Sequence, residues 1–148
     1  MQQFENSNHN LQLTRNILQE NIQILDDDSL PEKLYNWVMN KLSRATPIEA
    51  RVIAVTLNSF SILIQHFPLG NIANNIEIAI IDYKIAAVIS KQQSFLEEWA
   101  SLQNNLGVAY TDRIKGIKSD NLEVAIVAFR DAITVRKKKN IQSNGRKL

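Results

Sequence analysis

Two adjoining segments decide the fold: EEWASLQNNLGVAYTDRIKG at residues 97–116 and SDNLEVAIVAFRDAITVR at residues 119–136. Between Leu122 and Ile133, the apolar residues recur at spacings of one and three positions, which places them on one face of an α-helix. Gly116 lies where this pattern breaks. The two segments therefore predict an antiparallel helix pair with a connecting loop around Gly116.

The same pattern occurs 46 residues earlier in the chain. Residues 50–90 align with residues 96–136 without a gap, and the matches follow the helical period. The identical pairs are Ala54 and Ala100, Asn58 and Asn104, Gly70 and Gly116, Asn75 and Asn121, Glu77 and Glu123, Ala79 and Ala125, Ile80 and Ile126, and Ala86 and Ala132. Repetition at a fixed distance is typical of stacked structural units, so we expect two such units.

Capping signals predict where the helices begin. Thr46 and Glu49 have the spacing of a capping box, and Pro47 occupies the first helical position, where its missing N–H costs nothing. The same spacing predicts four further helix starts, at Ser29 with Glu32, Asn74 with Glu77, Ser94 with Glu97, and Asp120 with Glu123. The predicted helices are 11–25, 31–43, 47–66, 75–91, 95–114 and 121–138.

The expected organisation has five parts. They are a flexible N-terminus at 1–10, an N-terminal helical pair at 11–45 that is a degenerate repeat or a cap, a first repeat at 46–92, a second repeat at 93–138, and a basic flexible tail at 139–148. A single helix pair cannot bury its apolar faces alone, and stacking of pairs completes the core. The predicted fold class is all-α, with antiparallel helix pairs stacked as a short solenoid.

The composition fits one domain made of long helices. The chain has 148 residues, 45% of them hydrophobic, with only four Gly and three Pro to interrupt helices. The absence of Cys excludes disulfides, Cys-ligated zinc and thiol catalysis. No uninterrupted apolar run approaches the roughly 20 residues of a membrane span, and the first ten residues lack signal-peptide regions. We expect a cytoplasmic protein that does not enter a membrane.

The net charge of +2 hides a basic C-terminal segment. Residues 136–148 hold six basic residues and no acid. Such a segment can contact nucleic acid or anionic lipid. However, no aromatic residue lies within it to stack on bases, and cations also favour the C-terminal end of a helix dipole. We therefore favour a solvated helix end and expect no nucleic-acid partner.

Small residues indicate where helix backbones approach each other. Gly107 lies in the middle of a predicted helix, where Gly costs about 1 kcal/mol relative to Ala. Ala79 and Ala125 hold the matching site on the second helices. A helix interior tolerates that cost for a packing reason, so a larger side chain at Gly107 or Ala125 is expected to overpack the core.

The residues Asn105-Leu106-Gly107-Val108-Ala109-Tyr110, followed by Ala125, Phe129 and Ala132, resemble the tetratricopeptide repeat signature. More narrowly, residues 97–136 resemble the long repeats of cyanobacterial proteins that carry a caspase-like CHAT domain, and Phe67-Pro68-Leu69-Gly70-Asn71 resembles the loop of their first repeat. The resemblance covers about residues 30–137. Its structural repeat positions are Ala79, Tyr83, Ala86, Trp99, Leu106, Gly107, Tyr110, Ala125, Phe129 and Ala132.

The resemblance implies a right-handed tetratricopeptide-like solenoid that binds protein on its concave face. The matching first-helix positions are Asn58, Ile62, Gln65, Asn104, Val108 and Thr111. An Asn side chain there can bind a peptide backbone through its amide. Alternatively, Asn58 and Asn104 form a hydrogen-bond ladder between the repeats; both interpretations stay open.

No residues assemble a catalytic site in the sequence. His9 and His66 have no second ligand at metal spacing, no phosphate-binding loop occurs, and no nucleophile has a base and an orienting group. Asp26, Asp27 and Asp28 fit a solvated turn better than a cation site. We therefore expect no enzyme, metal or cofactor.

The predicted function is a protein–protein interaction scaffold or adaptor. Its partner is a protein or peptide, or further repeats of a larger signalling protein, because the family pattern continues into another repeat where KKKNIQSNGRKL follows Arg136 here. The alternative is a self-assembling structural helical module, since an uncovered end helix favours homo-oligomers.

Overall fold

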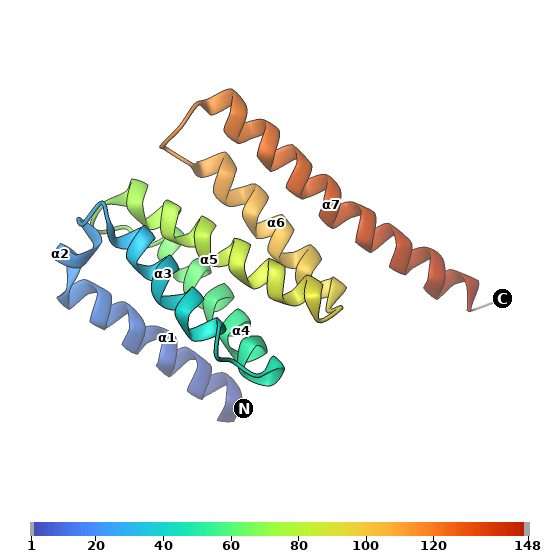
Figure 1. Cartoon of the computed structure of the whole chain (residues 1–148), viewed down its shortest axis with the longest axis horizontal. Helices are drawn as coiled ribbons and strands as arrows, with labels where there is room; N and C mark the ends of the chain where they lie inside the picture. The colour runs from blue at the N-terminus through green and yellow to red at the C-terminus, as the bar shows by residue number, and fades with distance from the viewer. Residues whose placement is uncertain (1, 147–148) are drawn as a thin grey trace.

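The computed structural model describes residues 2–146, with side chains from residue 9 onward, and this part of the chain is helical with no strand. The all-helical prediction is confirmed. The helices shown in Figure 1 are α1 Gln2–Glu20, α2 Ile22–Leu25, α3 Leu30–Leu42, α4 Pro47–Gln65, α5 Ile72–Gln92, α6 Leu96–Asp112 and α7 Lys118–Gly145.

Helices α4 with α5 and α6 with α7 form two hairpins that lie side by side, with α1 and α7 at opposite edges of the molecule (Figure 1). Helix α5 is at the centre, because it packs against α3, α4 and α6. Thirteen of its 21 residues are buried, whereas only four of the 28 residues of α7 are. Burial of apolar surface in these contacts is the main force that stabilises the arrangement.

The ten structural repeat positions lie in the core or against it. Trp99 and Phe129 are partly buried and pack against the core cluster, and the other eight are buried. Gly107 lies against the ring of Phe129: a Cβ added to Gly107 would come within 2.6 Å of Cε1 of that ring. The ring fills the space that a side chain at 107 would need, which is the packing reason expected for this Gly.

In the first hairpin, different residues form the contact that is equivalent to Gly107 with Phe129. Ser61 and Tyr83 hold the positions that Gly107 and Phe129 hold 46 residues later. The Tyr83 hydroxyl donates to Oε1 of Gln65 at 3.1 Å, and burial raises the pKa of Tyr83 to about 12. Phe129 has no hydroxyl, so its hairpin needs no such acceptor.

Two predicted N-cap residues, Thr46 and Ser29, are confirmed, but of the five predicted capping boxes only the one at Thr46 forms. The Thr46 capping box forms, with the Glu49 N–H donating to Thr46 Oγ1 at 3.2 Å and the Thr46 N–H to Glu49 Oε2 at 2.8 Å. Elsewhere the N-cap residues are Ser29 without a side-chain cap, Asn71, Phe95 and Ile117. The predicted boxes at Asn74 and Asp120 are wrong because α5 and α7 begin earlier.

The predicted boxes at Ser29 and Ser94 are wrong for different local reasons. The Ser29 hydroxyl and N–H donate to Asp27, at 2.6 and 2.9 Å, instead of accepting from the helix. Together with Lys33 these donors lower the pKa of Asp27. Ser94 has a φ of 61°, outside the extended range of a capping residue, and Phe95 takes the N-cap position.

Both chain segments expected to be flexible are helical where the structure describes them. Residues 2–10 form the first part of α1, and α7 continues through residues 139–145. Residues 137–144 contain no Gly or Pro that would end the helix after the second repeat. Residues 1, 147 and 148 lie outside the described residues.

From the sequence we expect no segment apolar enough to span a membrane, and helix α4 differs from that expectation. By length and composition alone it is apolar enough to cross a membrane, and among the described helices it is the one that meets this test. Its face toward α6 nevertheless carries Arg51, Asn58 and Gln65, and each pairs with a polar side chain of α6.

Candidate interaction groove between α4 and α6

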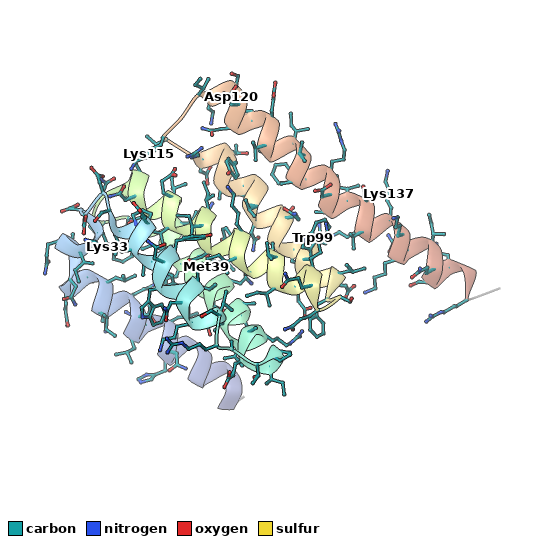
Figure 2. The ribbon with its side chains drawn as sticks, in the orientation of Figure 1. Lys33, Met39, Trp99, Lys115, Asp120 and Lys137 are labelled. Carbon is teal, nitrogen blue, oxygen red and sulfur yellow. The ribbon has the colours of Figure 1, made fainter. Side chains whose placement is uncertain are left out.

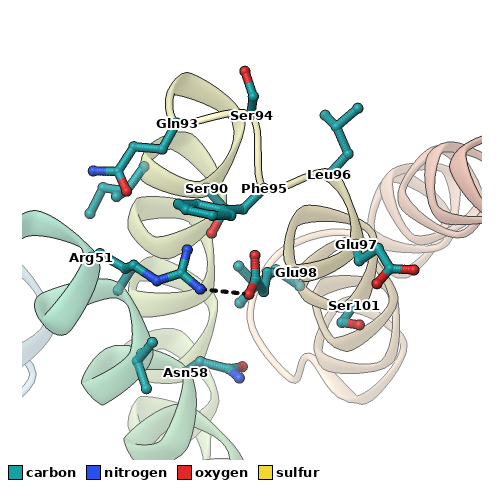
Figure 3. Close-up of a pocket in the computed structure, with 14 residues that line it drawn as sticks. Arg51, Asn58, Ser90, Gln93, Ser94, Phe95, Leu96, Glu97, Glu98 and Ser101 are labelled. Carbon is teal, nitrogen blue, oxygen red and sulfur yellow. Dashed lines mark hydrogen bonds and ion pairs between the residues drawn. The ribbon is translucent and has the colours of Figure 1, made fainter. Parts of the chain in front are cut away.

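Helices α4 and α6 border a groove of about 590 Å³ whose floor is the C-terminal part of α5. Figure 3 shows this groove with Arg51 and Asn58 on one wall and Glu98 and Ser101 on the other. Its lining residues are Arg51, Ala54, Val55, Asn58, Ile89, Ser90, Gln93, Ser94, Phe95, Leu96, Glu97, Glu98, Ser101 and Leu102.

Three polar pairs join α4 to α6. Arg51 donates to Glu98 at 2.9 Å, Asn105 donates to Asn58 at 3.3 Å, and Gln65 donates to Asp112 at 3.2 Å. The three paired residues of α4 are seven positions apart in sequence, and so are the three of α6. Seven positions are about two helical turns, so the paired residues lie on one face of each helix. The pairs therefore hold α4 and α6 in one parallel register.

In the pair of Arg51 with Glu98, the arginine also contacts an aromatic ring. The Arg51 guanidinium lies 3.5 Å from the centroid of the Phe95 ring, whose face favours its positive charge. Figure 3 shows the two side chains next to each other. The Phe95 N–H donates to the Ser90 carbonyl at 2.9 Å, and Ser94 has a φ of 61°, which is uncommon for a residue other than Gly. This tight turn positions an aromatic ring at the mouth of the groove.

The structure brings only one of the predicted partner-binding residues into this groove. Asn58 lines it, paired with Asn105 and not with Asn104, which is half-buried one position away. Gln65 is buried and uses both ends of its amide within the chain, toward Tyr83 and Asp112. The ladder between the repeats therefore forms, but with a different residue from α6.

The remaining predicted residues lie on the surface outside the groove. Ile62 is exposed and borders a cavity beside α1. Val108 and Thr111 are exposed on α6, and the Thr111 hydroxyl donates to the Gly107 carbonyl at 2.9 Å. These three side chains are accessible but do not converge with Asn58.

Sequence reasoning missed Arg51, Phe95, Glu98 and Ser101. The alignment at 46 residues pairs equivalent positions, but the contacting residues are 47 apart, as in Arg51 with Glu98. A search for complementary polar residues one position beyond the repeat length would have found all three pairs.

A second connection joins the hairpins near the other end of α6. Arg113 donates from Nε to Glu77 Oε1 at 2.7 Å and from Nη2 to Oε2 at 3.0 Å, and from Nη1 to Asn121 at 3.0 Å. The Glu77 carboxylate raises the pKa of Arg113, and bidentate pairs of this kind are strong. Arg113 thus links α5 to the start of α7.

An Asn near the start of α5 and α7 binds the preceding loop in both hairpins. Asn75 Nδ2 donates to the Leu69 carbonyl at 3.0 Å, and Asn121 Nδ2 donates to the Lys115 carbonyl at 2.9 Å. Asn121 Oδ1 accepts from Arg113, but Asn75 Oδ1 is buried and has no hydrogen-bond partner among the described residues. The position equivalent to Arg113 is Phe67, which cannot donate a hydrogen bond.

Comparisons with family models, with curated proteins and with solved structures find no match. The function is therefore inferred from geometry. Within the described residues, no three His, Cys, Asp or Glu side chains gather as a metal site. Of the acidic run, Asp27 accepts from Lys33, and Asp28 accepts from Asn74 and lies 3.9 Å from Lys115. Figure 2 labels the two lysines, Lys33 and Lys115.

Proposed function

We propose that this chain is a protein-binding scaffold of tetratricopeptide-like helix pairs, which holds an extended peptide in the groove between α4 and α6. The observation that carries the proposal is the groove lined by Arg51, Asn58 and Glu98, between two helices that three polar pairs hold in register. A right-handed solenoid, a place within a larger signalling protein and a cytoplasmic location belong to the same proposal.

The groove offers a peptide both apolar contact and hydrogen bonds. Val55 is 56% exposed and Leu96 is 51% exposed, and they lie among the amides and hydroxyls of Asn58, Ser90 and Ser101. Interfaces between proteins combine apolar residues with polar groups in this manner. Because Arg51 and Glu98 are already paired, binding does not have to order them, which reduces the entropic cost.

The proposal is tested by selecting random 12-residue peptides on the intact chain and mapping the best binder by amide chemical shifts. The shifts are expected to concentrate along α4 and α6 and in the Ser94–Phe95 turn. Ser101→Trp fills the groove from an exposed position and should weaken binding at least tenfold with little change in melting temperature. Shifts confined to another surface, or unchanged affinity of Ser101→Trp, would contradict the proposal.

A matched pair of variants separates the predicted partner residue from the observed ladder. Asn104→Ala removes an amide that makes no side-chain hydrogen bond among the described residues, while Asn105→Ala removes the bond to Asn58. If Asn104 binds the peptide, its variant loses affinity at an unchanged melting temperature. If only Asn105→Ala alters binding, Asn104 has no role and the ladder positions the groove.

A second candidate function is self-assembly through α7. Val124 is 43% exposed and Ile126 is 54% exposed, whereas the equivalent Ile78 and Ile80 of α5 are 1% and 3% exposed. The neighbours of α5 cover those two residues, and nothing in the described chain covers the α7 pair. Light scattering at several concentrations tests this function: a mass that rises with concentration and returns to monomer in Ile126→Lys supports it, and a constant monomer mass rejects it.

A further inference from the structure

A second cavity, of about 570 Å³, lies between α1, α3 and α4 and reaches α5 at one residue. It is distinct from the groove between α4 and α6, with which it shares only Val55. Most of its walls are apolar. The lining residues are Asn10, Leu11, Thr14, Leu34, Trp37, Val38, Val55, Thr56, Leu57, Ser59, Phe60, Leu63 and Asp82.

Among the side chains that the structure describes, Asp82 is the one ionisable group that lines this cavity. It is 2% exposed, and no described residue forms an ion pair or a hydrogen bond with its carboxylate. A buried carboxylate without a cation is costly, because the surroundings replace neither the hydration nor the counter-charge that water supplies.

The repeat itself does not require this acid. The equivalent position of the second hairpin is Ala128, which is also buried, at 6% exposed. A small apolar residue therefore satisfies the packing of the second helix at this point. The carboxylate of Asp82 is an addition to the repeat pattern, and it lies where a cavity of ligand size opens.

We propose that this cavity binds a small organic amine, whose ammonium group pairs with the Asp82 carboxylate and whose apolar body packs against Leu34, Leu57 and Phe60. An ammonium supplies the missing counter-charge and hydrogen-bond donors, and the walls supply the apolar contact. A neutral ligand of the same shape leaves the carboxylate without a counter-charge, and an anionic one is repelled. The cavity therefore selects by charge and by apolar character together.

Affinity for the amine is expected to fall as the pH decreases. Burial raises the pKa of Asp82 to about 7, so below that pH the carboxyl is neutral and cannot pair with an ammonium. From residue 9 to residue 146, no other titratable group lines the cavity. The titratable groups elsewhere on the four helices, from residue 9 onward, are His9, Arg15, Glu20, Glu32, Lys33, Tyr35, Lys41, Glu49, Arg51, Glu77, Tyr83, Lys84 and Lys91.

Isothermal titration calorimetry on the intact chain at pH 8 tests the proposal with three probes of one shape. They are 2-phenylethylamine, 2-phenylethanol and 3-phenylpropanoate, which are cationic, neutral and anionic. The amine should bind at least tenfold more tightly than the alcohol, and the carboxylate should not bind. Lowering the pH to 6 should weaken binding of the amine severalfold.

Three variants locate the site. Asp82→Asn keeps the side-chain shape and should reduce affinity for the amine at least tenfold, whereas Asp120→Asn removes an exposed acid on α7 and should bind the amine unchanged. Ser59→Trp fills the cavity from an exposed position of α4 and should abolish binding without altering Asp82.

The proposal is overturned by any of three outcomes: no heat of binding with the amine, equal affinity for amine and alcohol, or unchanged affinity in Asp82→Asn. Circular dichroism of each variant establishes that it is folded, and Ser59→Trp provides a second decision if Asp82→Asn is not. Loss of peptide binding in the groove between α4 and α6 has no bearing on these titrations, so the two proposals fail independently.

Discussion

At the scale of single residues, contact between α6 and α7 depends on a helical Gly and an aromatic ring. The Phe129 ring occupies the space beside Gly107, and the equivalent space in the first hairpin is beside Ser61, whose hydroxyl donates to its own helix at the Leu57 carbonyl. Gly107 lets the helices approach at the cost of about 1 kcal/mol in helix propensity.

A side chain at Gly107 is expected to destabilise the fold. Gly107→Leu should lower the free energy of unfolding by roughly 1–3 kcal/mol, because the Phe129 ring has to move. Gly107→Ala should cost less, since its helix propensity is better. Urea unfolding measures both. Gly145→Ala is the control: nothing lies within 4 Å of its added Cβ, so stability should be unchanged or rise by up to about 1 kcal/mol. Equal stability of Gly107→Leu and wild type would exclude the contact.

Asp82 is expected to make the stability depend on pH. Burial raises its pKa from 3.8 to about 7, so the native state binds this proton more tightly than the unfolded chain does. The contribution to the free energy of unfolding is therefore fully present below pH 3.8 and is lost as the pH rises through 7, by at most about 4 kcal/mol. Thermal unfolding of Asp82→Asn should lack this decline, while Asp120→Asn should keep it. A parallel decline in wild type and Asp82→Asn would contradict the assignment.

At the scale of helices, the side-chain pattern predicted the buried face of α5 well and that of α7 only in part, since Leu122, Ile126 and Ile133 are exposed, and it predicted the helix caps poorly. The apolar period depends on the sequence alone, and so Ala79, Tyr83 and Ala86 were placed in the core correctly. Helix ends depend on partners that are distant in sequence: Asn74 donates to Asp28 and accepts from Lys115, so it serves a contact between segments and not a cap. Such use of a polar residue cannot be deduced from local spacing.

The groove between α4 and α6 also depends on contacts that local sequence spacing does not predict. The sequence predicted that α4 and α6 would carry the binding residues, and Asn58 does line the groove. The register of the contact is one residue longer than the repeat, and only the packing of α4 and α6 on α5 sets that offset. Arg51 and Phe95 could not be brought together from the sequence, because the turn at Ser94 places the ring.

Arg113 is expected to contribute more to stability than exposed cations do. Arg113→Ala leaves the Glu77 carboxylate, which is 16% exposed, without its bidentate partner and removes the donor to Asn121. The free energy of unfolding should fall by roughly 1–3 kcal/mol. Lys33→Ala breaks an exposed ion pair with Asp27 and should cost less than about 1 kcal/mol. Equal losses in the two variants, measured by urea unfolding, would show that Arg113 is no more than a surface cation.

At the scale of the molecule, burial is concentrated on one helix. Helix α5 is enclosed by three others, whereas α7 is covered along one side and carries exposed side chains, including Lys137, along its length (Figure 2). In α7 the buried positions end at Ala132, and from Arg136 to Arg146 every residue is exposed. Local stability follows such differences in burial and packing.

Amide hydrogen exchange should reproduce this order. The amides of α5 are expected to exchange most slowly, those of α4 and α6 at intermediate rates, and those of residues 137–145 fastest, because opening the last turns exposes no buried side chain. Mass spectrometry of peptic fragments after deuterium labelling measures the order. Uniform protection of α5 and of residues 137–145 would be incompatible with a core centred on α5.

The contact made by Arg113 also limits how copies of this chain can associate. It joins an acid of one hairpin to a base of the next, so it is directional, and head-to-tail contacts of this kind propagate as open filaments unless they close into a ring. The acid equivalent to Glu77 is present on α7 as Glu123, but the position equivalent to Arg113 in the first hairpin is Phe67, so a second copy has no base to pair with that acid. Polymerisation through an equivalent of this contact is therefore not expected, so any assembly through α7 has to use its exposed apolar residues instead.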